Sequence, residues 1–212
     1  MSLTEHSKIT DEIDLETYHR LSGLSSSGLR YLDKSPAHFK AWKDGKIQIE
    51  SKSLELGSRV HLYLESKKKF EATYVMRPWD FDGRRKECKE FVKDLVCSGR
   101  EMITETEWKQ VESIVQSYQS CQDRLVSIAR DSDGMNEVTV LWEEQGMPMR
   151  CRPDRLIYPN EENCTWLHEE FPALFPAPFG LSICVDYKTT SKFPDPKMWY
   201  YQCKDYGYAL AA

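Results

Sequence analysis

Residues 151–157 read CRPDRLI and residues 184–190 read CVDYKTT, and these two segments decide the fold. Successive side chains of a strand point to opposite faces. Asp186 and Lys188 therefore share a polar face, while their apolar neighbours share the other. A second aspartate, Asp154, also closes an apolar-flanked strand. Two aspartates offer hard oxygen ligands for Mg²⁺ or Mn²⁺, and a lysine beside them can orient a water. The pattern is typical of metal-dependent phosphodiester hydrolysis.

The same short pattern has a plainer interpretation. A carboxylate two residues from a lysine is common as a surface ion pair, which contributes little to stability. D-x-K also occurs by chance in many chains. Three other segments favour the catalytic interpretation.

The first of these segments is LELGSRVHLYLE at residues 54–65. Leu56, Val60 and Leu64 recur every four residues, which predicts a helix with one buried stripe. Gly57 and His61 lie beside that stripe, also four residues apart. A histidine at such a place is either an ordinary core or surface residue or a metal ligand.

The other two segments lie near the ends of the chain. In YYQCKDYGYALAA at residues 200–212, Gln202 and Tyr206 share a helical face. LSSSGLRYLDKSPAHFKAW at residues 24–42 has serines suited to a helix N-cap. Its Ser35-Pro36 predicts the N-cap and first position of a further helix.

Taken in order, these segments resemble the nuclease domain of exodeoxyribonuclease VIII (RecE), a branch of the PD-(D/E)xK superfamily alongside RecB-type nucleases and phage lambda exonuclease. The motifs that carry the resemblance are L-R-x-L-x-x-S-P-A-H-F, G-x-x-x-H, R-P-D, V-D-Y-K-T-T and Q-x-x-x-Y. The resemblance implies an α/β (α+β) restriction-endonuclease-like core: a central mixed sheet flanked by helices, with extra N-terminal helices. It runs from about Leu24 to the end of the chain.

Position by position, the resemblance implies a metal site. His61, Asp154 and Asp186 match the metal-binding residues, and Lys188 matches the catalytic lysine. The carbonyl of Tyr187 is expected to be a further metal ligand.

The resemblance also assigns a substrate-positioning role to Gln202 and Tyr206. Glu137 is either an auxiliary acid or, as the plainer interpretation, an exposed glutamate at the end of a strand.

The function that the resemblance implies is a Mg²⁺- or Mn²⁺-dependent exonuclease. It would digest linear duplex DNA from 5′ to 3′ in bacterial or prophage recombination, with a single-strand annealing protein as partner and a ring-shaped homo-oligomer as assembly. Two alternatives stay open: a non-catalytic DNA-binding or assembly domain that keeps the fold, and a structure-specific endonuclease using the same site.

The composition is that of an ordinary globular chain. We expect a polar, partly disordered segment over residues 1–23 and one nuclease domain over residues 24–212. The resemblance implies more strand and helix beyond Ala212. No run approaches the ~20 apolar residues of a membrane span. Seven scattered cysteines, without a C-x₂-C pair, indicate a reducing cytoplasm and disfavour a zinc or iron–sulfur site.

The net charge of −5 does not favour DNA binding by bulk electrostatics, so a nuclease would need a local basic surface. The candidates are Lys67 to Lys69, Arg84 to Lys86, and the helix start near Ser27 and Arg30. The plainer interpretation of each basic run is solvated surface.

Between the motifs, the sequence predicts scaffold. A capping box at Thr104 and Glu107 begins an amphipathic helix that continues through Ile128. EVTVLW and MPMRCRPDRLIY read as strands of a hairpin. The stretch 159–180 is far longer than a turn requires. It is expected to be a loop over the site, an oligomer contact or a disordered excursion.

Overall fold

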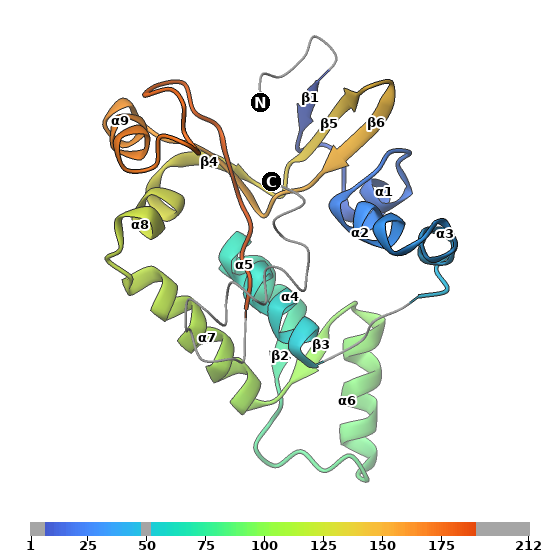
Figure 1. The fold of residues 1–212 in the computed structure, drawn as a ribbon. Helices are drawn as coiled ribbons and strands as arrows, with labels where there is room; N and C mark the ends of the chain where they lie inside the picture. The colour runs from blue at the N-terminus through green and yellow to red at the C-terminus, as the bar shows by residue number, and fades with distance from the viewer. Residues whose placement is uncertain (1–6, 48–51, 190–212) are drawn as a thin grey trace. The chain divides into compact units, whose positions relative to one another are not determined.

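The computed structural model describes residues 7–47 and 52–189, and the fold is mixed α/β, as predicted (Figure 1). The chain separates into two compact units. Unit 1 comprises residues 1–51, 134–157 and 182–212, and unit 2 comprises residues 52–133 and 158–181. In the described residues the strands are divided among three small sheets, where the resemblance implies one central mixed sheet.

The first sheet of unit 1 has the order β1-β5-β6. The strand β1 (Lys8–Thr10) runs antiparallel to β5 (Thr139–Glu144), which forms a hairpin with β6 (Met147–Cys151) (Figure 1). Gln145 and Gly146 close the hairpin with φ of 50° and 78°. Positive φ at both central residues is what a tight two-residue hairpin turn needs. The predicted hairpin is confirmed.

The described part of the N-terminal segment forms one strand and one helix, and its predicted partial disorder stays a prediction. It contains β1 and the helix α1 (Leu15–Arg20), whose N-cap Asp14 accepts from the Thr17 N–H at 2.8 Å. Tyr18 is buried, with the Arg150 guanidinium 4.8 Å from its ring centre and donating to its carbonyl oxygen. The segment thus contacts β5 and β6, and its local composition does not reveal these contacts.

The helices α2 (Ser26–Lys34) and α3 (Pro36–Lys43) begin where the sequence predicts. Ser25 caps α2 and Ser35 caps α3, with Pro36 in the first turn. A Cβ on Gly28 would lie 3.1 Å from the Trp42 ring, so this glycine lets the two helices approach closely.

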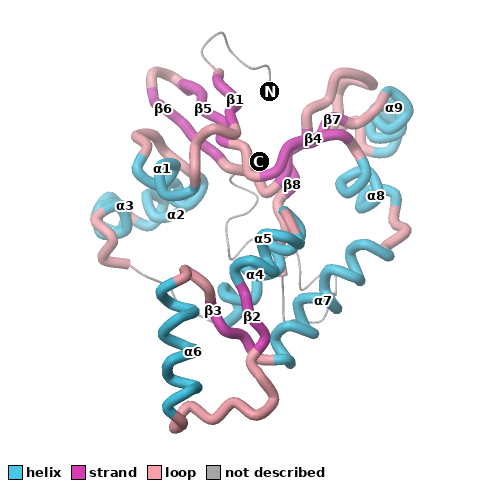
Figure 2. Tube along the Cα trace, turned by 180° about the vertical axis from the view of Figure 1, so that it is seen from behind, coloured by secondary structure: helices cyan, strands magenta, loops and turns pink. Residues whose placement is uncertain are grey.

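The second sheet of unit 1 has the order β4-β7-β8, and Figure 2 shows these strands together. It consists of β4 (Asp133–Asn136), β7 (Arg155–Tyr158) and β8 (Ile183–Val185). The predicted continuous strand MPMRCRPDRLIY is wrong, because it breaks between β6 and β7. Pro153 at the break cannot donate to a ladder. A Cβ on Gly134 would lie 2.3 Å from the Leu156 carbonyl oxygen, so β4 needs glycine there.

Unit 2 is built around a core of Val60, Phe70, Ile103, Val111 and Val115. These residues come from α4 (Lys52–Glu65), α5 (Lys67–Thr73), α7 (Glu105–Ser120) and a parallel pair of strands, β2 (Tyr74–Met76) and β3 (Glu101–Ile103). The helix α6 (Lys86–Cys97) precedes β3. The predicted helix at LELGSRVHLYLE and the capping box at Thr104 are confirmed.

Two predictions for unit 2 need correction. The long helix is interrupted, because Asp123 accepts from the Val126 N–H at 3.2 Å and caps a separate helix, α8 (Arg124–Asp131). The stretch 159–180 is not only loop: Asn160 caps α9 (Glu161–Glu170), whose Cys164 and Leu167 are buried. No helix of the described chain is both long and apolar enough to cross a membrane.

Candidate active site

The register of β7 and β8 places two aspartates opposite each other. The strands are antiparallel, with Arg155 paired to Val185 and Ile157 paired to Ile183. Asp154 directly precedes β7 and Asp186 directly follows β8, so one further step along the register pairs them. Cβ atoms of opposed residues in such a ladder lie about 4.5–5.5 Å apart. Residues distant in sequence are thus brought to one end of one strand pair.

Hydrogen bonds hold this arrangement. The Tyr187 N–H donates to Oδ2 of Asp154 at 2.5 Å, so the Asp154 carboxylate is tied to the chain segment that carries Asp186. Lys188 donates from Nζ to Oδ1 of Asp186, also at 2.5 Å. Exposure alternates along residues 183–189, as the strand pattern predicts, and leaves the Asp186 and Lys188 side chains accessible. Four of the predicted site residues, Asp154, Asp186, Tyr187 and Lys188, therefore take part in these contacts.

The electrostatics of Asp186 reflect the crowding of two carboxylates. Burial raises the pKa of Asp186 above its ordinary value, and the neighbouring charge and hydrogen bond of Asp154 add to the rise. The hydrogen bond and charge of Lys188 act in the opposite direction. Two opposed carboxylates repel each other when both are ionised, which favours a bound cation.

The donor set fits a hard divalent cation. Mg²⁺ is commonly held by one or two carboxylates, with waters and substrate phosphates completing its shell. Asp154 and Asp186 supply those carboxylates. Within residues 7–47 and 52–189, no cluster of three or more His, Cys, Asp or Glu side chains suits a metal. Because both donors are hard carboxylate oxygens, the pair fits a Mg²⁺ or Mn²⁺ site better than a zinc site built from nitrogen and sulfur ligands.

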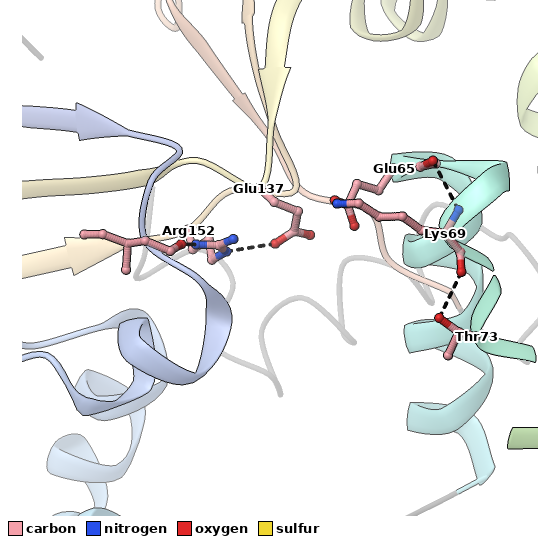
Figure 3. A network of polar contacts seen from close by, with 7 residues as sticks. Glu65, Lys69, Thr73, Glu137 and Arg152 are labelled. Atoms are coloured by element: carbon pink, nitrogen blue, oxygen red, sulfur yellow. Dashed lines mark hydrogen bonds and ion pairs between the residues drawn. The ribbon is translucent and has the colours of Figure 1, made fainter. Parts of the chain in front are cut away.

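Glu137 lies beside Asp154 and is not the plainly exposed glutamate that the sequence favours. Its N–H donates to the Asp154 carbonyl oxygen at 3.1 Å, and its φ is 54°, a region that non-glycine residues rarely adopt. Figure 3 shows its carboxylate facing Arg152, whose Nε donates to Oε2 at 3.0 Å. Strained backbone of this kind clusters at functional sites.

Arg152 is the site-supporting residue that sequence reasoning missed. Besides Glu137, its Nη1 donates to the Ile13 carbonyl oxygen at 2.7 Å and to Oγ1 of Thr139 at 2.9 Å. The side chain thus joins the N-terminal segment and β5 to the turn that carries Asp154. The available signal was the arginine of R-P-D, which the sequence analysis treated only as part of a motif.

The remaining predicted site residues are His61, Gln202 and Tyr206. His61 lies on α4 of unit 2, directly after the core residue Val60, and is half-buried. Its role as a metal ligand stays a prediction, as does that of the Tyr187 carbonyl. Gln202 and Tyr206 lie outside the described residues.

The first predicted basic run, Lys67 to Lys69, forms ion pairs with nearby glutamates. Lys69 pairs with Glu65 within the helical stretch (Figure 3), and Lys67 pairs with Glu71 at 3.6 Å. The Thr73 hydroxyl also donates to the Lys69 carbonyl oxygen at 2.9 Å. Lys67 and Lys69 thus each have a local carboxylate partner.

Residues 25–164 match the family described as a PDDEXK-like domain of unknown function (DUF3799). Because the match covers more than half of the chain, the protein belongs to this family. The matched range includes His61, Glu137 and Asp154 and ends before Asp186 and Lys188. No curated protein and no solved structure is significantly similar to the chain. Membership supports the PD-(D/E)xK superfamily and a nuclease-type fold.

Proposed function

We propose that this protein is a metal-dependent exonuclease of the RecE kind, which hydrolyses phosphodiester bonds at the ends of linear duplex DNA. The observation that carries the proposal is the opposition of Asp154 and Asp186 at the end of β7 and β8, with Lys188 bonded to Asp186. The family supports a nuclease-type fold, and the resemblance to RecE supports the duplex substrate and 5′-to-3′ direction.

Each residue of the group has a distinct role. Asp154 and Asp186 would hold a divalent cation, which would supply Lewis-acid stabilisation of the charge on the phosphate. Tyr187 fixes the orientation of the Asp154 carboxylate through its N–H, which donates to Oδ2. Lys188 aligns the attacking water and offsets negative charge on the phosphate in the transition state.

Further roles follow from the resemblance alone. In the proposed enzyme, His61 and the Tyr187 carbonyl complete the metal shell, and Gln202 and Tyr206 position the DNA. The same resemblance supports a ring-shaped homo-oligomer and a single-strand annealing protein as partner.

The direct test is digestion of linear duplex DNA labelled at one end or the other, with Mg²⁺, Mn²⁺ or EDTA. Wild type is compared with Lys188→Ala and with Lys109→Ala. The latter is a matched control, because Lys109 is also an exposed lysine bonded to a carboxylate, that of Glu105 at 2.6 Å. We expect metal-dependent digestion by wild type and Lys109→Ala and none by Lys188→Ala.

Closed circular DNA separates the alternatives. An exonuclease needs an end and leaves the circle intact, whereas nicking would replace the proposal with an endonuclease at the same site. Binding of linear DNA without digestion under every metal condition would instead indicate a non-catalytic DNA-binding domain.

A further inference from the structure

Trp79 is the most exposed large apolar side chain of the described residues, with 97% of its surface accessible. It lies in the loop between β2 and α6 of unit 2, where residues 77–86 read RPWDFDGRRK. Scattered exposed apolar residues are normal on protein surfaces. An almost fully exposed indole within a basic loop is less usual and offers a large aromatic face to a ligand.

The backbone of this loop is held in place. The Arg77 N–H donates to the Ile103 carbonyl oxygen at 2.8 Å, which anchors the loop to β3. The Phe81 N–H donates to the Pro78 carbonyl oxygen at 3.1 Å and closes a turn with Trp79 at its tip. Trp79 is therefore displayed by a hydrogen-bonded turn.

The loop is cationic in an acidic chain. Residues 77–86 contain four cations, Arg77, Arg84, Arg85 and Lys86, and two aspartates, a net charge of +2 against −5 for the whole chain. Asp82 is already engaged, because its Oδ1 accepts from the Arg84 N–H at 3.0 Å and its Oδ2 lies 4.0 Å from Nε of Arg85.

Two of the loop arginines are available to an anion. In the described part of the chain, no carboxylate pairs with the guanidinium of Arg77 or Arg84. Lys67 and Lys69, by contrast, are each paired with a glutamate of their own helical stretch. A stacking surface flanked by available cations suits a polyanion with aromatic groups.

We propose that the loop 77–86 binds single-stranded DNA, such as the unpaired end of a duplex. Trp79 stacks on a base, and Arg77 and Arg84 contact phosphates. Stacking on an aromatic side chain tolerates every base, because each base has a π face. The proposal rests on DNA as the proposed substrate and assigns to unit 2 a contact that does not depend on the aspartates.

The test measures fluorescence anisotropy of a labelled single-stranded oligonucleotide with the full chain in EDTA, so that no cleavage intervenes. Trp79→Ala is compared with Trp79→Phe, which keeps an aromatic face, and with Phe179→Ala. Phe179 is a matched control, because it is also an exposed aromatic of unit 2, with 68% of its surface accessible. We expect about tenfold weaker binding for Trp79→Ala and a smaller loss for Trp79→Phe. Phe179→Ala should bind like wild type.

The salt dependence tests the arginines. Arg84→Gln should lower the slope of log affinity against log salt by about 0.7, the value for one lost phosphate contact on a single strand. Arg20→Gln changes the net charge equally at an exposed site paired with Glu16 and should leave the slope unchanged.

The proposal is overturned if wild type does not bind the oligonucleotide, or if Trp79→Ala binds it as wild type does. Loss of self-association in Trp79→Ala, with DNA affinity unchanged, would identify the loop as a protein contact instead. If binding depends on Trp79 but no DNA is digested, the proposed nuclease function is refuted and the proposed DNA-binding role of the loop is supported. If DNA is digested but binding does not depend on Trp79, the nuclease function is supported and the DNA-binding role of the loop is refuted.

Discussion

Each unit contains a carboxylate that is hydrogen-bonded to a basic side chain, but the pKa values of the two carboxylates shift in opposite directions. In unit 2, the Glu107 carboxylate accepts from the Thr104 N–H at 2.8 Å, from the Thr104 hydroxyl at 2.7 Å and from Arg59 at 2.8 Å. These hydrogen bonds and the Arg59 charge lower the pKa of Glu107 to about 2. In unit 1, burial and the proximity of Asp154 raise the pKa of Asp186.

The two pKa values shift in opposite directions because the groups around each carboxylate differ. Glu107 has more than one donor for a single carboxylate, so the group is complete as it stands. Asp154 and Asp186 stand opposite each other, so the charge of each raises the free-energy cost of ionising the other. A satisfied group stabilises the fold, whereas an acidic pair of this kind is suited to a cation and to chemistry.

The largest expected effect concerns the acidic pair. Asp186→Asn removes a ligand charge and should lower DNA hydrolysis by about 10³-fold or more, equivalent to about 4 kcal/mol of transition-state stabilisation. The free energy of unfolding should stay within about 1 kcal/mol of wild type, because the change also removes a like-charge contact. Initial digestion rates and urea unfolding of the same samples measure both effects.

The matched control is Glu105→Gln, which breaks the exposed pair with Lys109 and should change neither quantity. Retention of near-full metal-dependent activity by Asp186→Asn would refute the metal-ligand role. A large loss of stability would mean that Asp186, like Glu107, stabilises the fold.

The next effect is confined to the core of unit 2. Phe70 is fully buried, with its ring centre 5.0 Å from that of Tyr63, 5.1 Å from that of Tyr74 and 4.9 Å from that of Trp108. Phe70→Ala should lower the free energy of unfolding by about 3–5 kcal/mol, because it removes buried apolar surface and leaves a cavity. Urea unfolding measures the loss. Leu174→Ala, at an exposed site of the same unit, should cost less than about 0.5 kcal/mol.

The smallest expected effect concerns the stability that the charge of Glu107 contributes in unit 2. The folded-state pKa of Glu107, about 2, lies below the ordinary value of 4.5, so its charge stabilises the fold fully above pH 4.5. That contribution is lost as pH falls from 4.5 toward 2. Because 37% of the side chain is exposed, solvent screening reduces the contribution to about 1 kcal/mol at neutral pH.

Glu107→Gln, which keeps a capping side chain but no charge, should therefore be about 1 kcal/mol less stable than wild type at pH 7. The difference should shrink as the pH is lowered through 4.5. Urea unfolding at a series of pH values measures it. A difference that does not vary with pH would show that Glu107 acts through packing or capping alone.

Predictions that rest on a few neighbouring residues succeeded. The caps at Ser25, Ser35 and Thr104 and the two-residue turn at Gln145-Gly146 follow from bonds between residues at most a turn apart. Errors arose where two local signals compete. Asp123 lies within a helical apolar pattern, but its carboxylate starts a new helix there.

The stretch 159–180 shows the same difficulty. Its prolines and aromatics predict a loop, and the cap at Asn160 was overlooked. Whether Cys164 and Leu167 are apolar surface or core depends on what they pack against, and hydrophobic periodicity alone does not reveal the partner.

The sequence by itself determined the mixed α/β class, the helix starts at Ser25, Ser35 and Thr104, the hairpin and the pairing of Asp186 with Lys188. These features depend on propensity and on side chains a few residues apart. Only the tertiary structure decided that Asp154 stands opposite Asp186 and that Arg152 joins Glu137, Ile13 and Thr139 around it. The physical reason is that strand register and long-range hydrogen bonds form only once the intervening chain has folded back, and local spacing does not specify them.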